Sequence, residues 1–375
     1  MKINIRQDEL LAGVQVVQRA ISSKSTLPIL NGIYLSAQNG LLYLRATDLE
    51  IGIEYSVAVE VIEEGTTVLP AKYFAEIVRK LPNMEITLEN KEDSNLFKIT
   101  YGTSEVELNT YDHKEYPVLP KIEGLYNLQV NPELLVNAIK FVSIAASSDA
   151  SRPIFTGILL EITERGFINL VATDTHRLAY RQVNFNNESA ENLNLSLIIP
   201  SRALNELSRI IRPEEEILEI QIAEKLTLFK TQNVMLISRL IEGQFPEYQE
   251  VIPKEFTSQI RVLTKGFRDS LERAALLSKD DLKTRSNVIK LNAQGNTLTI
   301  SSQSAEIGKI HEEIPIYLNG EEIEIAFNAK YLIDVLRVMD QEEIYLNLKG
   351  ALSAGVIKPT DNNNYLFLVL PVRLA

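Results

Sequence analysis

The chain has 375 residues, of which 45% are apolar and 23% charged, so it is long enough for two or three globular domains. It contains no cysteine, which excludes disulfides and thiolate metal sites and fits a reducing cytosol. Its formal net charge is −12, so binding to nucleic acid requires positive charge gathered on one surface. Residues 1–13 are too polar for a signal peptide and no apolar run reaches membrane-spanning length, so we expect a cytoplasmic protein without membrane contact.

The first stretch of chain alternates helix and strand patterns in a recognisable order. A helix is predicted over 8–21, and residues 27–55 follow with Pro-Ile, Gly-Ile, a polar turn and Ala-Thr-Asp. Residues 68–81 run from a short apolar strand into a second helix, and 95–111 alternate as strands do. The segment "EYPVLP" at 115–120 is the last landmark in this series.

The same landmarks return twice further along the chain. The equivalent segments are the opening helices 131–146 and 264–278, the strand pairs 152–180 and 288–314, the second helices within 198–211 and 326–339, and the closing segment 244–253. This period is longer than that of solenoid repeats, which indicates duplication of a whole domain.

We therefore predict three domains, called here the first repeat (1–121), the second repeat (122–253) and the third repeat (254–375). Each is expected to place two helices on one face of antiparallel sheet, which is an α+β fold.

The Ala-Thr-Asp segments raise the question of a catalytic site, because Asp174 lies close to His176. The first repeat has Asp48 at the same place but no histidine, which favours a turn in which the aspartate accepts backbone N–H groups. A hydrolase using Asp174 and His176 is the alternative, but no nucleophile elbow, His-Glu-x-x-His or phosphate loop occurs. The second repeat differs by Thr-His-Arg-Leu at 175–178. These residues either specialise one copy for binding or are ordinary polar strand residues.

Basic side chains gather on the predicted helices, opposite their apolar stripes. Six helical segments together carry +7, so the remainder carries −19. Charge without interleaved aromatic residues suits a phosphate backbone rather than unstacked bases. The alternative is that these side chains only solvate helices, as in a scaffold protein with no nucleic-acid role. The residues predicted to face DNA are Lys72, Arg79, Lys80, Arg202, Arg209, Arg212, Lys265, Arg268, Arg273, Lys330 and Arg337.

Five segments together resemble the bacterial DNA polymerase III beta subunit, the sliding clamp family, over the whole chain: "LPIL" (27–30), "ATDLE" (46–50), "VATDTHRLA" (171–179), "EGQFPEY" (242–248) and "LPVRL" (370–374). The resemblance implies a head-to-tail homodimer whose three repeated clamp domains per chain form a six-domain ring around duplex DNA. It implies no enzyme activity, no cofactor and no metal. The implied partners are double-stranded DNA without sequence preference, DNA polymerase III, the clamp loader and other proteins with a clamp-binding motif.

The resemblance also assigns residues. A peptide pocket between the second and third repeats, called here the dock, comprises Phe155, Thr173, Thr175, His176, Arg177, Leu178, Pro246, Val251, Leu352, Leu368, Leu370 and Arg373. Lys24 matches a basic loop position that faces DNA. Val106 and Leu108 of one chain are expected to meet Leu276 and Leu277 of the other.

Two departures from the family pattern stand out. Thr175 occupies a position where relatives often have glycine, which narrows one rim of the dock. Pro153 and Ile154 replace two aromatic residues that touch DNA in some relatives.

Overall fold

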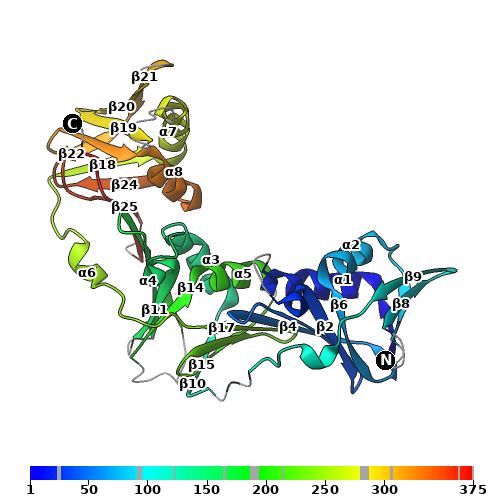
Figure 1. Ribbon diagram of the computed structural model, residues 1–375. Coiled ribbons are helices and arrows are strands. Elements are labelled where there is room, and N and C mark those ends of the chain that lie inside the picture. The colour runs from blue at the N-terminus through cyan, green and yellow to red at the C-terminus, as the bar shows by residue number, and fades with distance from the viewer. Residues whose placement is uncertain are drawn as a thin grey trace. The chain divides into compact units, whose positions relative to one another are not determined.

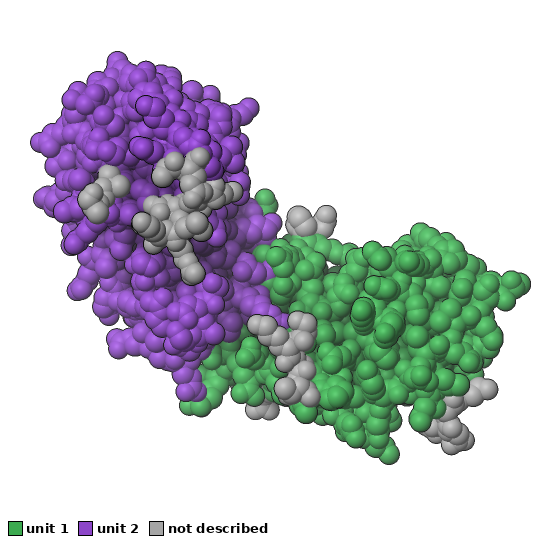
Figure 2. Space-filling view, turned by 45° about the horizontal axis from the view of Figure 1, so that its top comes forward, with its two compact units in different colours: residues 1–133, 206–240 green, residues 134–205, 241–375 purple. Residues whose placement is uncertain are grey.

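The computed structural model describes residues 1–22, 27–90, 95–120, 122, 124–163, 166–185, 194–212, 215–278, 287–304, 307–361 and 364–373. The chain divides into two compact units, residues 1–133 with 206–240 and residues 134–205 with 241–375 (Figure 2). The second repeat contributes to both units, so the units do not follow the predicted domain borders. The reason lies in the sheets, which strands of neighbouring repeats build together.

The first unit contains two sheets. The five-stranded sheet has the order β5 (Glu60–Glu63), β1 (Lys2–Arg6), β7 (Glu85–Asn90), β8 (Leu96–Tyr101) and β9 (Ser104–Asn109). The eight-stranded sheet has the order β10 (Tyr126–Val130), β15 (Leu218–Ile222), β16 (Leu226–Lys230), β17 (Val234–Arg239), β4 (Ile51–Ala58), β3 (Leu41–Thr47), β2 (Gly32–Gln38) and β6 (Gly65–Pro70). Helices α1 (Gln7–Val17) and α2 (Ala71–Lys80) lie side by side in this unit (Figure 1).

The second unit also contains two sheets. The nine-stranded sheet has the order β14 (Leu195–Pro200), β11 (Gly157–Thr163), β12 (Phe167–Thr173), β13 (Arg177–Asn184), β26 (Tyr365–Val369), β25 (Gly355–Pro359), β24 (Glu343–Leu348), β18 (Ser258–Leu263) and β22 (Tyr317–Gly320). The four-stranded sheet has the order β21 (Gly308–Pro315), β20 (Thr297–Ser304), β19 (Val288–Gln294) and β23 (Ile323–Asn328). The helices that lie wholly in this unit are α4 (Pro153–Thr156), α6 (Tyr248–Val251), α7 (Thr264–Ser278) and α8 (Ala329–Val338).

One strand pair in each large sheet joins two repeats. In the first unit β4 of the first repeat pairs antiparallel with β17 of the second repeat, from Ile51 opposite Ser238 to Tyr55 opposite Val234. In the second unit β13 of the second repeat pairs antiparallel with β26 of the third repeat. Neighbouring repeats are thus connected by backbone hydrogen bonds as well as by the chain itself.

The predicted helices are confirmed with small shifts at their ends. Helix α7 has the predicted bounds, whereas α1 ends at Val17 and continues as a 3₁₀ turn to Ala20. In the second repeat, α3 (Pro132–Ser143) is the opening helix and α5 (Ser201–Ile210) is the second helix. The second helices α2, α5 and α8 each have ten residues. Of the apolar residues predicted to form their stripes, Ile77 is half-buried and the others are buried, namely Phe74, Leu81, Leu204, Leu207, Ile211, Leu332, Val335 and Leu336.

Gly320 is the position where the backbone tolerates a side chain least. Its φ is +105°, and a Cβ there would lie 2.0 Å from the carbonyl oxygen of Thr257. We expect Gly320→Ala to lower the free energy of unfolding by about 3 kcal/mol or more, because strain and a backbone clash act together. Gly295→Ala is the matched control, since Gly295 also has a positive φ but no atom within 4 Å, and it should cost only about 1–2 kcal/mol. Urea unfolding followed by circular dichroism measures both, and equal losses would contradict the clash.

Candidate functional site

The Ala-Thr-Asp segments form two matching turns. Oδ1 of Asp48 accepts hydrogen bonds from the backbone N–H groups of Glu50 (3.1 Å) and Ile51 (2.9 Å). Oδ1 of Asp174 accepts them from His176 (2.9 Å) and Arg177 (3.0 Å). The turn predicted from the repeat is confirmed. The carboxylate of Asp174 is used by this turn, so it is not arranged to orient the imidazole of His176 as in a hydrolase.

The second residue after each threonine has left-handed backbone. Leu49 has φ +76° and Thr175 has φ +77°. A β-branched residue is disfavoured in this region, whereas glycine enters it without cost. The glycine that the resemblance leads us to expect at this position would adopt this backbone without strain, whereas Thr175 has a strained backbone and an exposed side chain.

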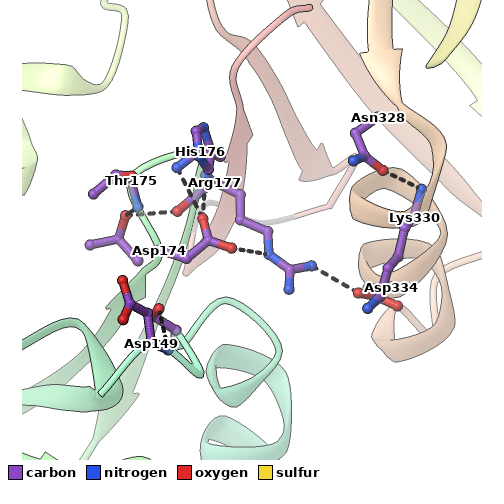
Figure 3. A network of polar contacts seen from close by, with 10 residues as sticks. Asp149, Asp174, Thr175, His176, Arg177, Asn328, Lys330 and Asp334 are labelled. Atoms are coloured by element: carbon purple, nitrogen blue, oxygen red, sulfur yellow. Dashed lines mark hydrogen bonds and ion pairs between the residues drawn. The ribbon is translucent and has the colours of Figure 1, made fainter. Parts of the chain in front are cut away.

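Arg177 ties this turn to helix α8 (Figure 3). Its Nε donates to Asp174 (3.0 Å) and its Nη1 donates to Asp334 of α8 (2.8 Å). The guanidinium also lies 4.5 Å from the ring centroid of Tyr331. The side chain is only 11% exposed. Arg177, which the resemblance assigns to the dock, therefore binds two carboxylates of its own chain.

His176 and Leu178 lie on either side of Arg177 and have different surroundings. The ring of His176 is stacked on that of Tyr331, with 6.4 Å between the ring centroids. The backbone carbonyl of His176 accepts a hydrogen bond from the N–H of Leu370 (2.8 Å). Leu178 is buried and pairs across β13 and β26 with Leu368. Alternate residues of a strand face opposite sides of its sheet, so Leu178 faces away from the side of Arg177.

A buried apolar cluster lies on the Leu178 side. Its members are Leu159, Val171, Leu178, Ile198, Phe245, Tyr248, Val356 and Leu368, and Ile154, Tyr180, Ile241, Ile252, Phe256, Ala354 and Leu366 pack against it. Thr173, also predicted for the dock, is buried at the end of β12, opposite Leu178. Ile154 is thus engaged in packing, whereas Pro153 beside it is exposed.

The remaining dock residues lie at the surface. Val251 is 57% exposed, Leu352 70% and Leu370 42%. Pro246 and Arg373 are exposed as well, and Phe155 is half-buried with the guanidinium of Arg152 5.5 Å from its ring. Large apolar side chains at this exposure contribute little to folding, which is what a binding rim around a buried floor requires.

Sequence reasoning missed the residues that hold the connecting segment against the sheet. The hydroxyl of Tyr248 in α6 donates to Oε2 of Glu161 in β11 (2.7 Å). Burial raises the pKa of Tyr248, so the hydroxyl stays protonated and keeps donating. Tyr248 stood in the "EGQFPEY" segment, but no local signal identified Glu161, nor Tyr331 and Asp334 as neighbours of the turn.

The basic helix residues are at the surface, apart from Arg268, which is half-buried, and Lys24, which lies outside the described residues. Several are paired with carboxylates: Arg209 with Glu206, Arg268 with Asp269, Arg273 with Glu312, and Arg337 with Glu272. The helices also carry one large exposed aromatic residue, Tyr73, so the expected absence of aromatic side chains holds only in part.

Arg273 differs from the other basic residues because it lies against the edge strand β21. Its Nε and Nη2 each donate to Glu312 at 2.6 Å. These hydrogen bonds lower the pKa of the Glu312 carboxyl, which keeps the pair ionised at neutral pH.

The four residues predicted for the contact between chains occupy two places. Val106 and Leu108 are half-buried on β9, which lies at the edge of the five-stranded sheet. Leu276 is exposed and Leu277 half-buried near the end of α7.

Among the described residues, no cluster of three or more His, Asp or Glu side chains is placed to hold a metal ion. No helix in that part of the chain has the length and apolarity to cross a membrane.

Three family models of the DNA polymerase III beta subunit match the chain in succession. The N-terminal domain matches residues 1–120, the central domain 129–247 and the C-terminal domain 249–373. The chain belongs to this family. The beta sliding clamp of Halalkalibacterium halodurans is 39% identical and that of Bacillus subtilis 36%, each over the full length of both chains.

Solved structures agree with this membership in the beta subunit family. The DNA polymerase sliding clamp of Bacillus subtilis matches with a TM-score of 0.93, 36% identity and complete coverage of both chains. The beta subunit of Thermotoga maritima matches with a TM-score of 0.92, 27% identity and the same coverage. The predicted α+β fold with three repeated clamp domains is confirmed.

We expect Asp334→Asn to lower the free energy of unfolding of the second unit by about 1–2 kcal/mol, because it removes one of two carboxylates from the buried guanidinium of Arg177. Glu272→Gln is the matched control, since its pair with Arg337 also involves a residue of α8 but is exposed. That substitution should cost less than about 0.5 kcal/mol. Urea unfolding at neutral pH compares them, and a larger loss for Glu272→Gln would contradict the ranking.

Proposed function

We propose that this beta subunit is a sliding clamp: two copies join head to tail into a ring around duplex DNA and tether the replicative polymerase to it. The ring is a processivity factor without catalytic chemistry of its own. Its other partners are the clamp loader and further proteins that carry a short clamp-binding motif, and it acts in the cytoplasm.

The pattern of strand pairing carries the ring proposal. β4 and β13 each follow an Asp turn and pair with β17 and β26, the last strands of the next repeat. In the third repeat β21 begins directly after Ile307, whose N–H contacts Oγ of Ser304 at the end of β20 (3.4 Å). Within the described chain β21 and β9 have a strand on one side only. The repeat therefore supports pairing of β21 with β9 of another copy, which continues the series and closes it head to tail.

Closure of the ring also explains how weak contacts to DNA are enough to keep the protein on it. A ring stays on DNA by topology, while attraction between Lys or Arg and phosphates lets it slide. Lys72, Arg79 and Lys80 of α2 are exposed and have no carboxylate partner in the described residues, so their charge is available.

The dock supports a second role as a binding platform. Its buried floor around Leu178 and its exposed rim of Val251, Leu352 and Leu370 fit apolar anchors of a short peptide. Arg177 in this proposal positions the turn rather than meeting the peptide, because Asp174 and Asp334 already hold its guanidinium.

Retention on circular DNA tests the ring. The protein loaded by a clamp loader onto nicked circular DNA should stay bound through gel filtration and leave when the DNA is linearised. Changing Lys72, Arg79 and Lys80 to Glu should reduce loading and lower the salt slope of binding by about 0.9 per lost phosphate contact. Glu60→Gln, an exposed change on β5, is the control. Equal retention on linear and circular DNA would contradict encirclement.

Peptide titration tests the dock. A peptide with glutamine first and leucine and phenylalanine later should bind once per protomer. Leu352→Ser and Leu370→Ser should each weaken it about 5- to 30-fold, the loss expected for one apolar contact. Leu263→Ser removes a leucine elsewhere in the second unit whose exposure, 48%, lies between those of Leu352 and Leu370, and it should leave affinity unchanged. Calorimetry gives both stoichiometry and affinity, and the dock is wrong if the Leu263 variant loses as much as the other two.

A further inference from the structure

The second helix of each repeat carries an acidic residue at the same place. Glu76 is the sixth residue of α2, Glu206 the sixth of α5 and Asp334 the sixth of α8. All three helices have ten residues and start directly after a strand, so these carboxylates have equivalent positions in the repeated fold.

Two of the three carboxylates accept an arginine of the preceding repeat. Arg19 of the first repeat donates from Nη1 to Glu206 of the second repeat (3.1 Å). Arg177 of the second repeat donates from Nη1 to Asp334 of the third repeat (2.8 Å). The carboxylate side chains are only 15% and 22% exposed. Each place where two repeats share a sheet thus also has an ion pair between them.

Glu76 is the exception. It is exposed, and within the described residues it has no hydrogen bond or ion pair. Within residues 1–375 the first repeat is the one for which no preceding repeat supplies an arginine. In a head-to-tail assembly the repeat that precedes it is the third repeat of another copy, next to the free edge of β9.

Arg273 has the features that the missing partner requires. It belongs to α7, the opening helix of the third repeat, and lies one turn before Leu276 on the same helix face. Nε and Nη2 are engaged by Glu312, and Nη2 also by Ser270 (3.1 Å), while Nη1 has no acceptor among the described residues. Arg177 divides its donors in a similar way, with Nε on Asp174 of its own repeat and Nη1 on the next repeat.

We propose that Glu76 of one protomer pairs with Nη1 of Arg273 of the partner subunit, so that the carboxylate at this helix position is paired with an arginine of the preceding repeat in all three repeats. The proposal rests on the ring proposed above and names a specific contact within it. It assigns Arg273 to the contact between chains rather than to DNA.

The first test measures dimer dissociation by sedimentation across a concentration series. Glu76→Gln and Arg273→Gln should each raise the dissociation constant about two- to fivefold, the range of a partly exposed ion pair. The dimer of the double variant should be no weaker than that of the more affected single variant. Either substitution alone already removes the ion pair, so the second has nothing further to remove. Glu206→Gln is the matched control, since it changes the same helix position but has an intrachain partner, and it should not alter dimerisation. Additive effects of the two Gln variants would overturn the proposal.

Charge reversal gives a second, independent test. Glu76→Lys alone and Arg273→Glu alone should each weaken the dimer more than the Gln variants, since like charges then meet at both contacts. An equimolar mixture should dimerise more strongly than either variant, because the heterodimer has one contact of wild-type charges and one of reversed, complementary charges. A mixture no stronger than its components would overturn the pair.

The outcome for the wild-type protein separates this inference from the ring. One outcome is that the wild-type chain dimerises while neither the set of single and double Gln variants nor the mixture of charge-reversed variants shows coupling between the two residues. In that case the proposed ion pair is wrong and the proposed ring stands. If the wild-type chain stays monomeric at every concentration and falls off circular DNA, the ring itself is wrong. Circular dichroism of each variant identifies any that fails to fold, and for such a variant the remaining Gln or charge-reversal arm decides.

Discussion

Backbone pairing between strands of neighbouring repeats is the constraint on which the rest of the structure depends. β4 with β17 and β13 with β26 fix the register between repeats, because a slip by one residue would turn every side chain to the other face. The turn before β13 is placed by the same register, and with it Leu178 beside Leu368 and His176 beside Leu370. The apolar floor of the dock and the ion pair of Arg177 both follow from one set of ladder hydrogen bonds.

Much of the fold could be predicted from the sequence, because comparing the repeats shows which features they share. The Asp turns were predicted because Asp48 has no histidine nearby, and the structure gives both aspartates the same two backbone donors. The bounds of α7 were predicted because its apolar periodicity is long and regular. Family membership followed from five short segments, each of which is weak alone.

Other parts depend on contacts that no local pattern records. Arg177 was predicted to face a peptide, but its partner Asp334 lies 157 residues along the chain. Only the three-dimensional register brings that carboxylate to the guanidinium. Glu161 is similar, since nothing around it in the sequence points to Tyr248. The division of the second repeat between two units was also beyond the sequence, because strand order in a sheet is a property of pairing rather than of periodicity.

The divided second repeat has a consequence for synthesis on the ribosome. β17 finds its neighbour β4 already made, so the first unit can close while the chain is still growing. β13 has no such neighbour until β26, the last strand of the third repeat, has emerged. For most of the time that the third repeat takes to appear, one side of β13 is an unprotected sheet edge, which other nascent chains can pair with. The strand that carries Leu178 of the dock therefore has an open edge during synthesis that is closed in the finished chain.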